Sequence, residues 1–325
     1  MKEKATIITG ISGEIGQNLI EYFSKNSNKK IIGIDLDNSK QNSQIFKFIN
    51  ASILDQKILD EIANDYIIEE IYHLAAILST KAEKNPELAE KVNISGTINM
   101  FNLALYQNSK HNILTKFFFP SSIAVYQVNK NDDSSLFVKE QMLCNPKTIY
   151  GQHKLFCENL GTSYDQNGNE LNLKIDFRCI RFPGIISANS MPTGGTSDYA
   201  PEMIHNAFKK KKYSCFVNET SVLPFIVMPD AIQSIINIMS SNKKSLTQNV
   251  YNITSFSPTV SDILNEIKNE CPSFKIDYKI NKQRQKIVNN WPNFIDDSKA
   301  KNDWGWLPKY DLSSAFKNYL TPILK

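Results

Sequence analysis

Several features of membrane, secreted and metal-binding proteins are missing from this 325-residue sequence. No apolar run approaches membrane-spanning length, and Met1 leads directly into a strand-like segment rather than a signal-peptide core. The five cysteines form no Cys-x-x-Cys pair and no Cys/His spacing suited to zinc. We therefore expect free thiols, no bound metal, and a soluble protein that contacts no membrane. The expected location is the cytoplasm, or an organelle if a presequence has been removed.

The sequence also lacks an excess of charge of either sign. Its 37 basic and 33 acidic residues are interspersed and leave a formal net charge of +4. The basic run from Lys209 to Lys212 is short, which is more typical of a solvated helix end than of a nucleic-acid patch. With 41% hydrophobic and 22% charged residues, the composition is that of a globular protein. We expect a sizeable core and no nucleic-acid partner.

What the first half does contain is an alternation of short β-branched runs and amphipathic stretches. Such alternation is typical of βαβ units, so it predicts an α/β fold with a doubly wound parallel Rossmann sheet. The expected strands are 6–9, 31–35, 45–49, 71–74, 117–120 and 175–181, and the expected helices are 15–24, 57–65, 86–107 and 149–166.

After Arg181 the pattern changes and predicts a smaller, discontinuous C-terminal substrate lobe. Residues 183–199 are rich in Gly, Pro, Ser and Thr, which favours a binding loop. A return to the main sheet is expected near 225–238 and 250–253. We therefore expect residues 1–181 and about 225–254 to form the NAD-binding domain, and residues 182–224 and 255–325 to form the substrate lobe.

A glycine-rich loop follows the first expected strand. Gly10, Gly13 and Gly16 let the chain turn tightly, approach a pyrophosphate and pack the next helix against the sheet. The helix N-terminus then offers free N–H groups and a favourable dipole to the anion. Asp35 ends the second expected strand, where a carboxylate accepts hydrogen bonds from both ribose hydroxyls and repels a 2′-phosphate. Together these features predict a dinucleotide site that prefers NAD to NADP.

Two further patterns supply groups for proton transfer. Tyr150 and Lys154 are four residues apart in an expected helix, so both side chains project from one face. The ammonium should stabilise the phenolate and lower the pKa of Tyr150, and it can also hydrogen-bond the nicotinamide ribose. The pair Ser121 and Ser122 follows a strand whose carboxyl end should face the ligand crevice. Each pattern alone also occurs on surfaces and in turns, but their order in one chain favours catalysis.

These motifs resemble those of the extended short-chain dehydrogenase/reductase family, which includes nucleotide-sugar epimerases and dehydratases. The resemblance covers essentially the whole chain and includes His73-Leu-Ala-Ala76, Asn93 with Gly96-Thr97, and Arg181-Phe-Pro-Gly184. It implies that Ser122, rather than Ser121, is catalytic together with Tyr150 and Lys154. The full set of expected cofactor contacts is Gly10, Gly13, Glu14, Ile15, Gly16, Asp35, Ser52, Ile53, Leu74, Ala75, Ala76, Asn93, Tyr150, Lys154, Pro183 and Ile185.

A narrower resemblance is to the short-chain L-threonine 3-dehydrogenases. The most specific motif of this resemblance is the loop Gly194-Gly-Thr-Ser-Asp-Tyr199, whose small hydroxyl groups suit a zwitterion better than a sugar nucleotide. The resemblance implies NAD-dependent oxidation of L-threonine at its β-hydroxyl to 2-amino-3-oxobutanoate, with Tyr150 as general base. Its other carriers are 120–125, 148–151, 181–187, Trp291-Pro and 295–298, and the implied substrate contacts are Ser79, Ser122, Tyr150, Gly184, Thr196 and Trp291.

Several alternatives stay open at this level. The same scaffold also carries sugar-nucleotide 4-epimerases and dehydratases, and a protein that only senses NAD is a third reading. Asp198 either faces the substrate ammonium or caps its own loop. Trp304 and Trp306 are expected in the C-terminal core. The family also implies a homodimer in which helices 86–107 and 149–166 pair across a two-fold axis.

The sequence departs from the family pattern at three places. His153 precedes the lysine where the family usually has Ser or Thr, Gln127 replaces a glycine after Tyr126, and residues 132–135 resemble an insertion. None of these removes a catalytic group, but His153 could alter the surroundings of the Tyr150 hydroxyl.

Overall fold

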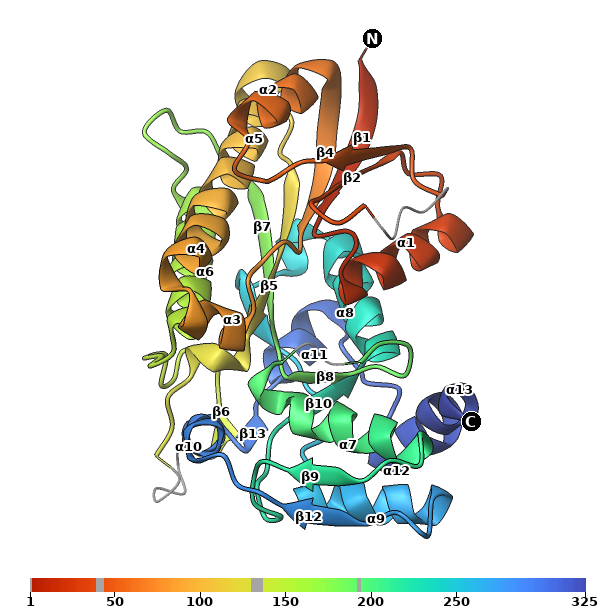
Figure 1. The fold of residues 1–325 in the computed structure, drawn as a ribbon. Helices are drawn as coiled ribbons and strands as arrows, with labels where there is room; N and C mark the ends of the chain where they lie inside the picture. The colour runs from red at the N-terminus through yellow and green to blue at the C-terminus, as the bar shows by residue number, and fades with distance from the viewer. Residues whose placement is uncertain (1, 39–43, 130–136, 192–193) are drawn as a thin grey trace.

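The computed structural model describes residues 2–38, 44–129, 137–191 and 194–325. Its centre is a seven-stranded parallel sheet in the order β11-β7-β5-β4-β1-β2-β3 (Figure 1). Because the strand order runs outward from β1 in both directions, the sheet is doubly wound and the predicted fold class is confirmed. The strands are β1 (Glu3–Thr9), β2 (Ile31–Asp35), β3 (Lys47–Asn50), β4 (Tyr66–His73), β5 (Lys116–Ser122), β7 (Asp176–Phe182) and β11 (Val250–Asn252).

Helices cover both faces of this sheet (Figure 1). One face carries α2 (Gln56–Asp65), α5 (Gly96–His111) and α6 (Ile149–Gln166), and the other carries α1 (Glu14–Asn26) and α8 (Met228–Ser240). Neighbouring residues of a strand point to opposite faces, so Ile7 joins the apolar cluster under α5 and Ile8 joins the one under α1. Burial on both faces explains why the strands read as continuous apolar runs.

All six strands and four helices expected in the first half are present, and α6 has the bounds that the sequence predicts. The long expected helix 86–107 is continuous but composite: α4 (Pro86–Glu90) passes through the π-helical turn η1 (Lys91–Ser95) into α5. Helix α4 begins with an N-cap: the Asn85 side chain accepts a hydrogen bond from Leu88 N at 3.2 Å, and Pro86 occupies the first turn. The short helix α3 (Ser79–Lys84) is not predicted by the sequence.

The prediction that residues 225–238 return to the main sheet is wrong. β10 (Phe225–Val227) instead pairs with β8 (Gly184–Ile186) in a separate two-stranded sheet, and Met228 begins α8. Helix α8 packs against β5 and β7 from the outside. Only residues 225–228 are continuously apolar; polar residues then recur at 230, 233, 234 and 237, which is the spacing of one helix face. The other predicted return is confirmed, because β11 pairs with β7.

Most of the remaining elements lie beyond the carboxyl end of the main sheet, in the lower half of Figure 1. Residues 243–245 instead lie at its amino end, where Lys243 pairs with Asp176, the first residue of β7. Residues 183–199, expected as a loop, include β8 and the short 3-10 turn η4 (Thr196–Asp198). The other elements are η2 (Ile123–Val125), β6 (Phe137–Val138), α7 (Tyr199–Phe208), β9 (Tyr213–Cys215), η5 (Lys243–Ser245), α9 (Val260–Glu270), β12 (Ile276–Tyr278), α10 (Lys282–Asn290), β13 (Phe294–Ile295), α11 (Ser298–Trp304), α12 (Leu312–Ala315), η6 (Phe316–Leu320) and α13 (Thr321–Leu324).

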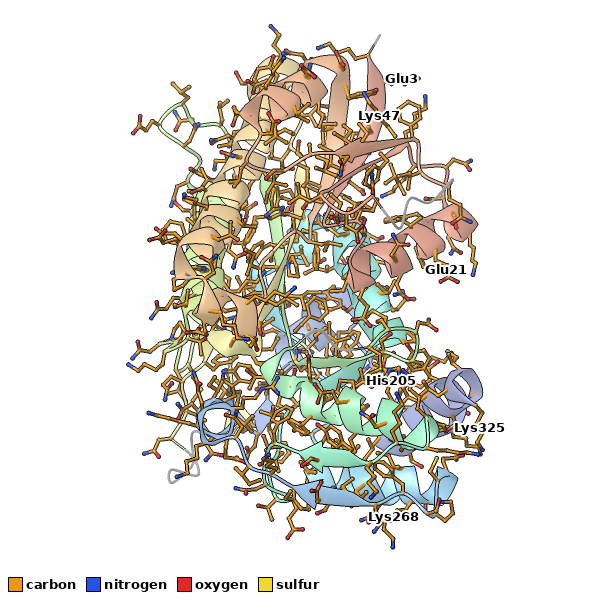
Figure 2. The ribbon with its side chains drawn as sticks, viewed as in Figure 1. Glu3, Glu21, Lys47, His205, Lys268 and Lys325 are labelled. Carbon is orange, nitrogen blue, oxygen red and sulfur yellow. The ribbon has the colours of Figure 1, made fainter. Side chains whose placement is uncertain are left out.

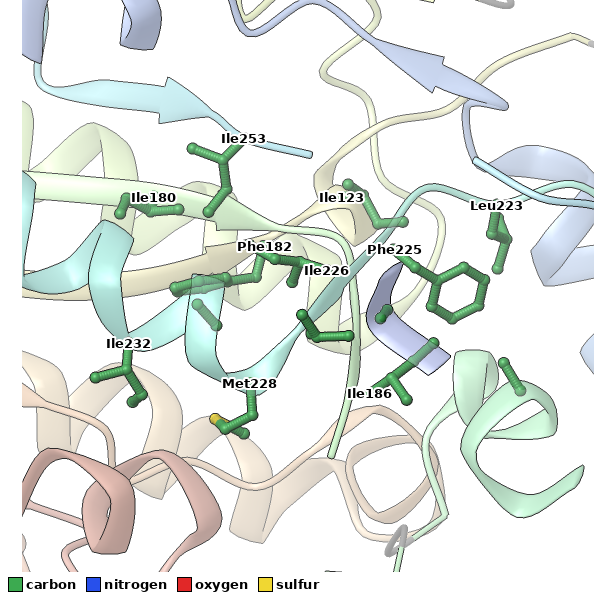
Figure 3. Close-up of a cluster of buried hydrophobic side chains, with 14 of the residues drawn as sticks. Ile123, Ile180, Phe182, Ile186, Leu223, Phe225, Ile226, Met228, Ile232 and Ile253 are labelled. Atoms are coloured by element: carbon green, nitrogen blue, oxygen red, sulfur yellow. The ribbon is translucent and has the colours of Figure 1, made fainter. Parts of the chain in front are cut away.

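Apolar side chains join this region to the sheet. Figure 3 shows Phe225 and Ile226 of β10 and Ile186 of β8 packed beside Ile123 and Phe182, which extend from the ends of β5 and β7. The C-terminal part has a tryptophan core, as expected: the Trp304 and Trp306 rings are both buried, with centroids 5.9 Å apart. We propose the domain bounds predicted from the sequence, except that β10 belongs with β8 in the substrate lobe, and this packing is the junction between the two parts.

Most charged side chains lie on the surface. Glu21, Lys268 and Lys325 lie at the periphery in Figure 2, and the run Lys209–Lys212 is exposed just after α7, where a solvated helix end was expected. All five cysteines are free thiols. Within the described ranges, no helix combines the length and the apolar character needed to cross a membrane.

Candidate active site

The glycine loop joins β1 to α1 at the carboxyl edge of the sheet. Gly10 has φ +66°, and a Cβ there would lie 2.7 Å from Ala75 N, so only glycine fits. A Cβ on Gly16 would lie 2.7 Å from Ile11 Cα and would prevent α1 from packing against the loop. Gly13 is the N-cap of α1 and brings no capping side chain, so the first N–H groups of the helix, from Glu14 onward, are available to an anion. This backbone fits a pyrophosphate.

Asp35 ends β2 beside this loop, as the sequence predicts. Its Oδ2 accepts a hydrogen bond from Ser12 N at 2.9 Å, and its Oδ1 accepts from Asp37 N at 3.0 Å. The Ser12 hydroxyl donates to Asp37 O at 2.6 Å. These bonds hold a half-buried carboxylate next to the glycine loop, where it fits ribose hydroxyls and disfavours a phosphate.

Two of the expected cofactor contacts, Ser52 and Ile53, lie after β3. The Ser52 hydroxyl accepts from Leu54 N at 3.1 Å and is half-buried. Ile53 is buried and packs against α5, where a Cβ on Gly96 would lie 2.8 Å from Ile53 Cγ1. Gly96 therefore lets α5 approach this loop closely.

The loop Leu74–Ala76 follows β4 and lies against Gly10. Leu74 N donates to Thr9 O at 3.1 Å, and Ala75 N donates to the Thr9 hydroxyl at 3.2 Å. Asn93 holds the next residue: its Nδ2 donates to Ile77 O at 2.9 Å and its Oδ1 accepts from Ile77 N at 2.7 Å. Both polar atoms of the Asn93 amide are thus engaged behind the loop. We infer that Asn93 positions the cofactor loop, and its direct contact with the cofactor stays a prediction.

His73 connects the two sides of this site through a directed chain of hydrogen bonds. The Thr97 hydroxyl donates to Asn93 O at 2.7 Å, so it must accept from His73 Nε2, 2.9 Å away. His73 Nδ1 is then unprotonated and accepts from the Thr9 hydroxyl at 2.8 Å. Burial, with a contribution from Lys154, lowers the pKa of His73 to about 3. His73 is therefore a neutral imidazole with one defined tautomer.

The first turn of α6 carries Tyr150, and two side chains cap this turn. The Thr148 hydroxyl accepts from Gly151 N at 3.1 Å, and Glu83 of α3 accepts from Ile149 N at 2.7 Å. A Cβ on Gly151 would lie 2.8 Å from Pro146 Cβ and closer still to Ala124 O. The missing side chain therefore allows α6 to begin directly against η2, the turn that follows Ser122.

Lys154 is buried one turn further along α6. Its Nζ donates to Pro120 O at 2.6 Å and lies 4.4 Å from the centroid of the Phe119 ring and 5.6 Å from that of the Tyr150 ring. Burial lowers the pKa of Lys154 to about 8. Burial also raises the pKa of the half-buried Tyr150 above its usual value, so the protein without ligands holds a neutral phenol. This differs from the expectation that Lys154 lowers that pKa, because desolvation outweighs the ammonium directed at Pro120.

Ser121 and Ser122 are neighbours on β5 and face opposite sides. Ser121 is buried, and its hydroxyl has no hydrogen-bond partner among the described residues. Ser122 is half-buried, and its Oγ accepts from Ala124 N at 3.1 Å, which leaves its proton free to donate. The geometry therefore favours Ser122 as the hydroxyl that serves a substrate.

The residues expected beside the nicotinamide lie at the start of β8. Pro183 and Gly184 are buried, and Ile185 is half-buried. A Cβ on Gly184 would lie 2.6 Å from Phe225 Cδ1 and 3.1 Å from Ser197 Cβ. Glycine at this position thus lets η4 and β10 pack against the strand.

Two expected substrate contacts come together from elements far apart in the sequence. Thr196 is buried at the start of η4, and the Thr80 hydroxyl of α3 donates to Gly194 O, which brings the neighbouring Ser79 to the same loop. Asp198 Oδ2 accepts from Gly194 N at 2.8 Å and from Gly195 N at 2.5 Å. Of the two readings left open for Asp198, the structure therefore supports the cap of its own loop.

Trp291 is buried directly after α10. The same helix carries Arg284, whose Nη2 donates to Gly195 O at 2.6 Å. Arg284, Thr80 and Glu83 all contact the site region, and the sequence analysis missed them. No sequence signal marks them, since each acts through a contact to a residue at least 66 positions away.

The three departures from the family pattern have different outcomes. His153 is buried, and burial lowers its pKa; its Nδ1 has no hydrogen-bond partner within the described part of the chain. Gln127 N donates to Leu143 O at 2.9 Å. Residues 132–135 lie outside the described residues.

Comparison with known proteins agrees with this geometry. The model of the NAD dependent epimerase/dehydratase family matches residues 6–254. The mitochondrial L-threonine 3-dehydrogenase of Bos taurus is 33% identical over 315 residues, which are 95% of this chain and 80% of that protein. A monomeric L-threonine 3-dehydrogenase from a metagenome, solved in its apo form, matches with a TM-score of 0.87 at 37% identity over 98% of both chains. The L-threonine dehydrogenase of Clostridium difficile matches with a TM-score of 0.87 at 32% identity, over 99% of this chain and 98% of that one.

The class of protein follows from the fold, the site and these matches: it is an extended short-chain dehydrogenase/reductase, an enzyme class that uses NAD(P). The chain belongs to the NAD dependent epimerase/dehydratase family. Within that family it resembles the L-threonine 3-dehydrogenases over nearly its whole length.

Proposed function

We propose that this enzyme oxidises L-threonine at its β-hydroxyl to 2-amino-3-oxobutanoate with NAD⁺. The observation that carries the proposal is the loop Gly194–Tyr199, which buries Thr196, is bound to α3 through Gly194 O and Thr80, and binds its own charged side chain, Asp198, internally. Such a loop offers small polar groups to a zwitterion and no cluster of cations for a diphosphate. Relatives named as L-threonine 3-dehydrogenases, at 33% and 37% identity, support the same substrate.

The proposed cofactor site uses the groups described above. The N–H groups at the start of α1 hold the pyrophosphate, Asp35 accepts from the adenosine ribose, and Ser52 and Ile53 flank the adenine. Lys154 and Tyr150 contact the nicotinamide ribose, with Pro183 and Ile185 beside the ring. The bound cofactor supplies the hydride acceptor and a positive charge next to the phenol. We infer NAD rather than NADP because Asp35 would repel a 2′-phosphate.

In the proposed reaction Tyr150 acts as the general base. Its phenol must first lose a proton, and Lys154, whose Nζ lies 5.6 Å from the centroid of the Tyr150 ring, is the protein cation that favours the phenolate. Ser122 donates its free proton to the substrate oxygen, which stabilises the alkoxide that develops as Tyr150 takes the proton. Ser79, Gly184 and Thr196 hold the amino acid, and Trp291 closes the pocket.

The test is the replacement Tyr150→Phe, which removes one hydroxyl and keeps the ring. We expect turnover of L-threonine to be lost while NAD⁺ binding stays close to that of the wild type. NADH formation is followed by the absorbance of the reduced nicotinamide, with L-threonine and UDP-glucose assayed side by side. Retained activity in the variant would contradict the role of Tyr150. Epimerisation of UDP-glucose without NADH formation, together with no oxidation of L-threonine, would overturn the substrate assignment.

We also propose a homodimer in which α5 and α6 pair with their copies. Leu88 of α4 and Phe156 of α6 support it, because they leave 45% and 44% of their surface exposed on the helices expected to pair. The metagenomic relative is described as monomeric, so the two proteins offer a direct comparison. Light scattering at micromolar concentration should give twice the mass of one chain, and a monomer mass would overturn the proposal.

A further inference from the structure

All four backbone polar groups of Gly194 and Gly195 are bound by side chains. Their two N–H groups donate to Asp198 Oδ2, at 2.8 Å and 2.5 Å. Gly194 O accepts from the Thr80 hydroxyl, and Gly195 O accepts from Arg284 Nη2 at 2.6 Å. These three side chains belong to η4, α3 and α10, so the dipeptide is held from three directions. Two adjacent glycines would otherwise be the most mobile part of the loop.

Neighbouring groups hold Arg284 in position for its hydrogen bond to Gly195 O. Its backbone N donates to the Asn281 side chain at 3.0 Å, which caps α10 and fixes the first turn of the helix. The guanidinium carbon lies 3.7 Å from the centroid of the Phe216 ring, so the flat cation is stacked and loses little further freedom when it binds Gly195 O. Glu202, which accepts from the Tyr213 hydroxyl at 2.9 Å, adds a carboxylate that attracts Arg284.

We propose that Arg284 is a positioning residue that determines affinity for the amino acid substrate by holding the loop Gly194–Tyr199 in its binding geometry. It acts through Gly195, one residue before Thr196, and does not need to touch the substrate. Because α10 also leads into Trp291, one rigid helix fixes both the loop and the tryptophan. The identity of the substrate rests on the function proposed above, but the effect on the loop does not.

Replacement of Arg284 by methionine tests the contact. Methionine keeps an unbranched apolar stem on Phe216 and removes the donor to Gly195 O. A hydrogen bond from a charged group contributes enough that its loss should raise KM for L-threonine by about 10- to 100-fold. We expect kcat to change by only a few-fold and KM for NAD⁺ to stay unchanged, because the hydrogen bonds that hold Gly194 and Gly195 in the described structure go to Asp198, Thr80 and Arg284, not to the glycine loop or Asp35.

Two further variants serve as controls for Arg284→Met. Arg284→Lys retains a cation that can donate to Gly195 O but lacks the flat stack on Phe216, so it should rescue much of the loss in KM. It also keeps the test valid if the methionine variant fails to fold. Lys286→Met removes an exposed cation from the same helix and should behave as the wild type.

Hydrogen exchange of the 194–199 segment in the ligand-free protein gives a readout that does not depend on the substrate. We expect faster exchange in Arg284→Met, near wild-type exchange in Arg284→Lys, and no change in Lys286→Met. If the wild type does not oxidise L-threonine but exchange accelerates, the proposed function fails and the positioning role stands. If KM rises with no change in exchange, Arg284 contacts the substrate directly and the proposal is overturned. It is equally overturned if neither quantity changes.

Discussion

Gly151 should tolerate alanine in terms of folding but not in terms of catalysis. Alanine is favoured over glycine within a helix by about 1 kcal/mol. Against that gain, a Cβ at this position would lie 2.8 Å from Pro146 Cβ and closer to Ala124 O, where an ordinary contact needs 3.4 Å. Overpacking of this kind destabilises proteins by about 1–3 kcal/mol. The expected net loss for Gly151→Ala is therefore about 0–2 kcal/mol, which leaves the protein folded.

The effect on activity should be larger, because the atoms that must move include those that place Tyr150. Relief of the clash with Ala124 O requires a shift of about 1 Å between the start of α6 and η2, the turn after Ser122. Misplacement of reacting groups by about 1 Å reduces rates by about 100-fold. We expect kcat/KM for L-threonine and NAD⁺ to fall by at least about tenfold.

Gly161→Ala is the matched control. Gly161 lies on the same helix, and a Cβ there would lie 2.6 Å from Phe177 Cδ2, a core ring on β7 far along the helix from Tyr150. Thermal unfolding, NAD⁺ binding and steady-state kinetics are measured for both variants. Gly161→Ala should lose stability while its folded fraction keeps a kcat within a few-fold of the wild type. Equal losses of activity in the two variants, once corrected for unfolded protein, would refute the reasoning.

Three further predictions concern charged and titrating groups. Asp35→Ser should weaken NAD⁺ binding by about tenfold, because it removes a hydrogen bond to a charged group. It should also raise the ratio of NADP⁺ to NAD⁺ activity, and an unchanged ratio in steady-state kinetics would contradict this. Because the pKa of His73 is about 3, its imidazole NMR signals should show one Nε2–H tautomer and no titration between about pH 5 and 8. A titration midpoint near pH 6.5 would be inconsistent with the hydrogen-bond chain. Lys154 has a pKa of about 8 in the folded protein against 10.5 ordinarily, so the folded state binds fewer protons than the unfolded state within that window. The stability of the wild type relative to Lys154→Met should therefore rise as pH increases from 8 to 10.5, and a Tm difference that does not vary with pH would contradict the burial of the ammonium.

Local patterns in the chain were enough to predict the parts of the site that depend on neighbours in sequence. Gly10, Gly13 and Gly16 follow a strand and precede a helix, and Asp35 ends the next strand; the structure has both features where they were expected. The bounds of α6 follow from its Thr148 cap, which sequence alone can suggest. The fold class follows from the same alternation of periods.

Predictions that depend on packing were less complete. The segment 225–238 was predicted to return to the main sheet, but it divides into β10 and α8. Its polar residues at 230, 233, 234 and 237 recur at helical spacing, which favours a helix after the short apolar strand. No local pattern predicted that the Asn93 amide binds both backbone polar groups of Ile77. The pKa of Tyr150 was expected to fall, but burial raises it in the protein without ligands.

The order of residues by itself determined the class of enzyme, because a phosphate loop, an acidic strand end and a Tyr/Lys pair each depend on fixed, short spacings. Only the tertiary structure decided how the substrate loop is held. Thr80 and Arg284 meet Gly194 and Gly195 across 114 and 89 residues, and no local pattern encodes which distant hydroxyl or guanidinium will reach a backbone carbonyl. Such contacts form only when the whole chain packs. A buried carbonyl then needs a hydrogen-bond donor, and the fold determines which side chains lie within reach.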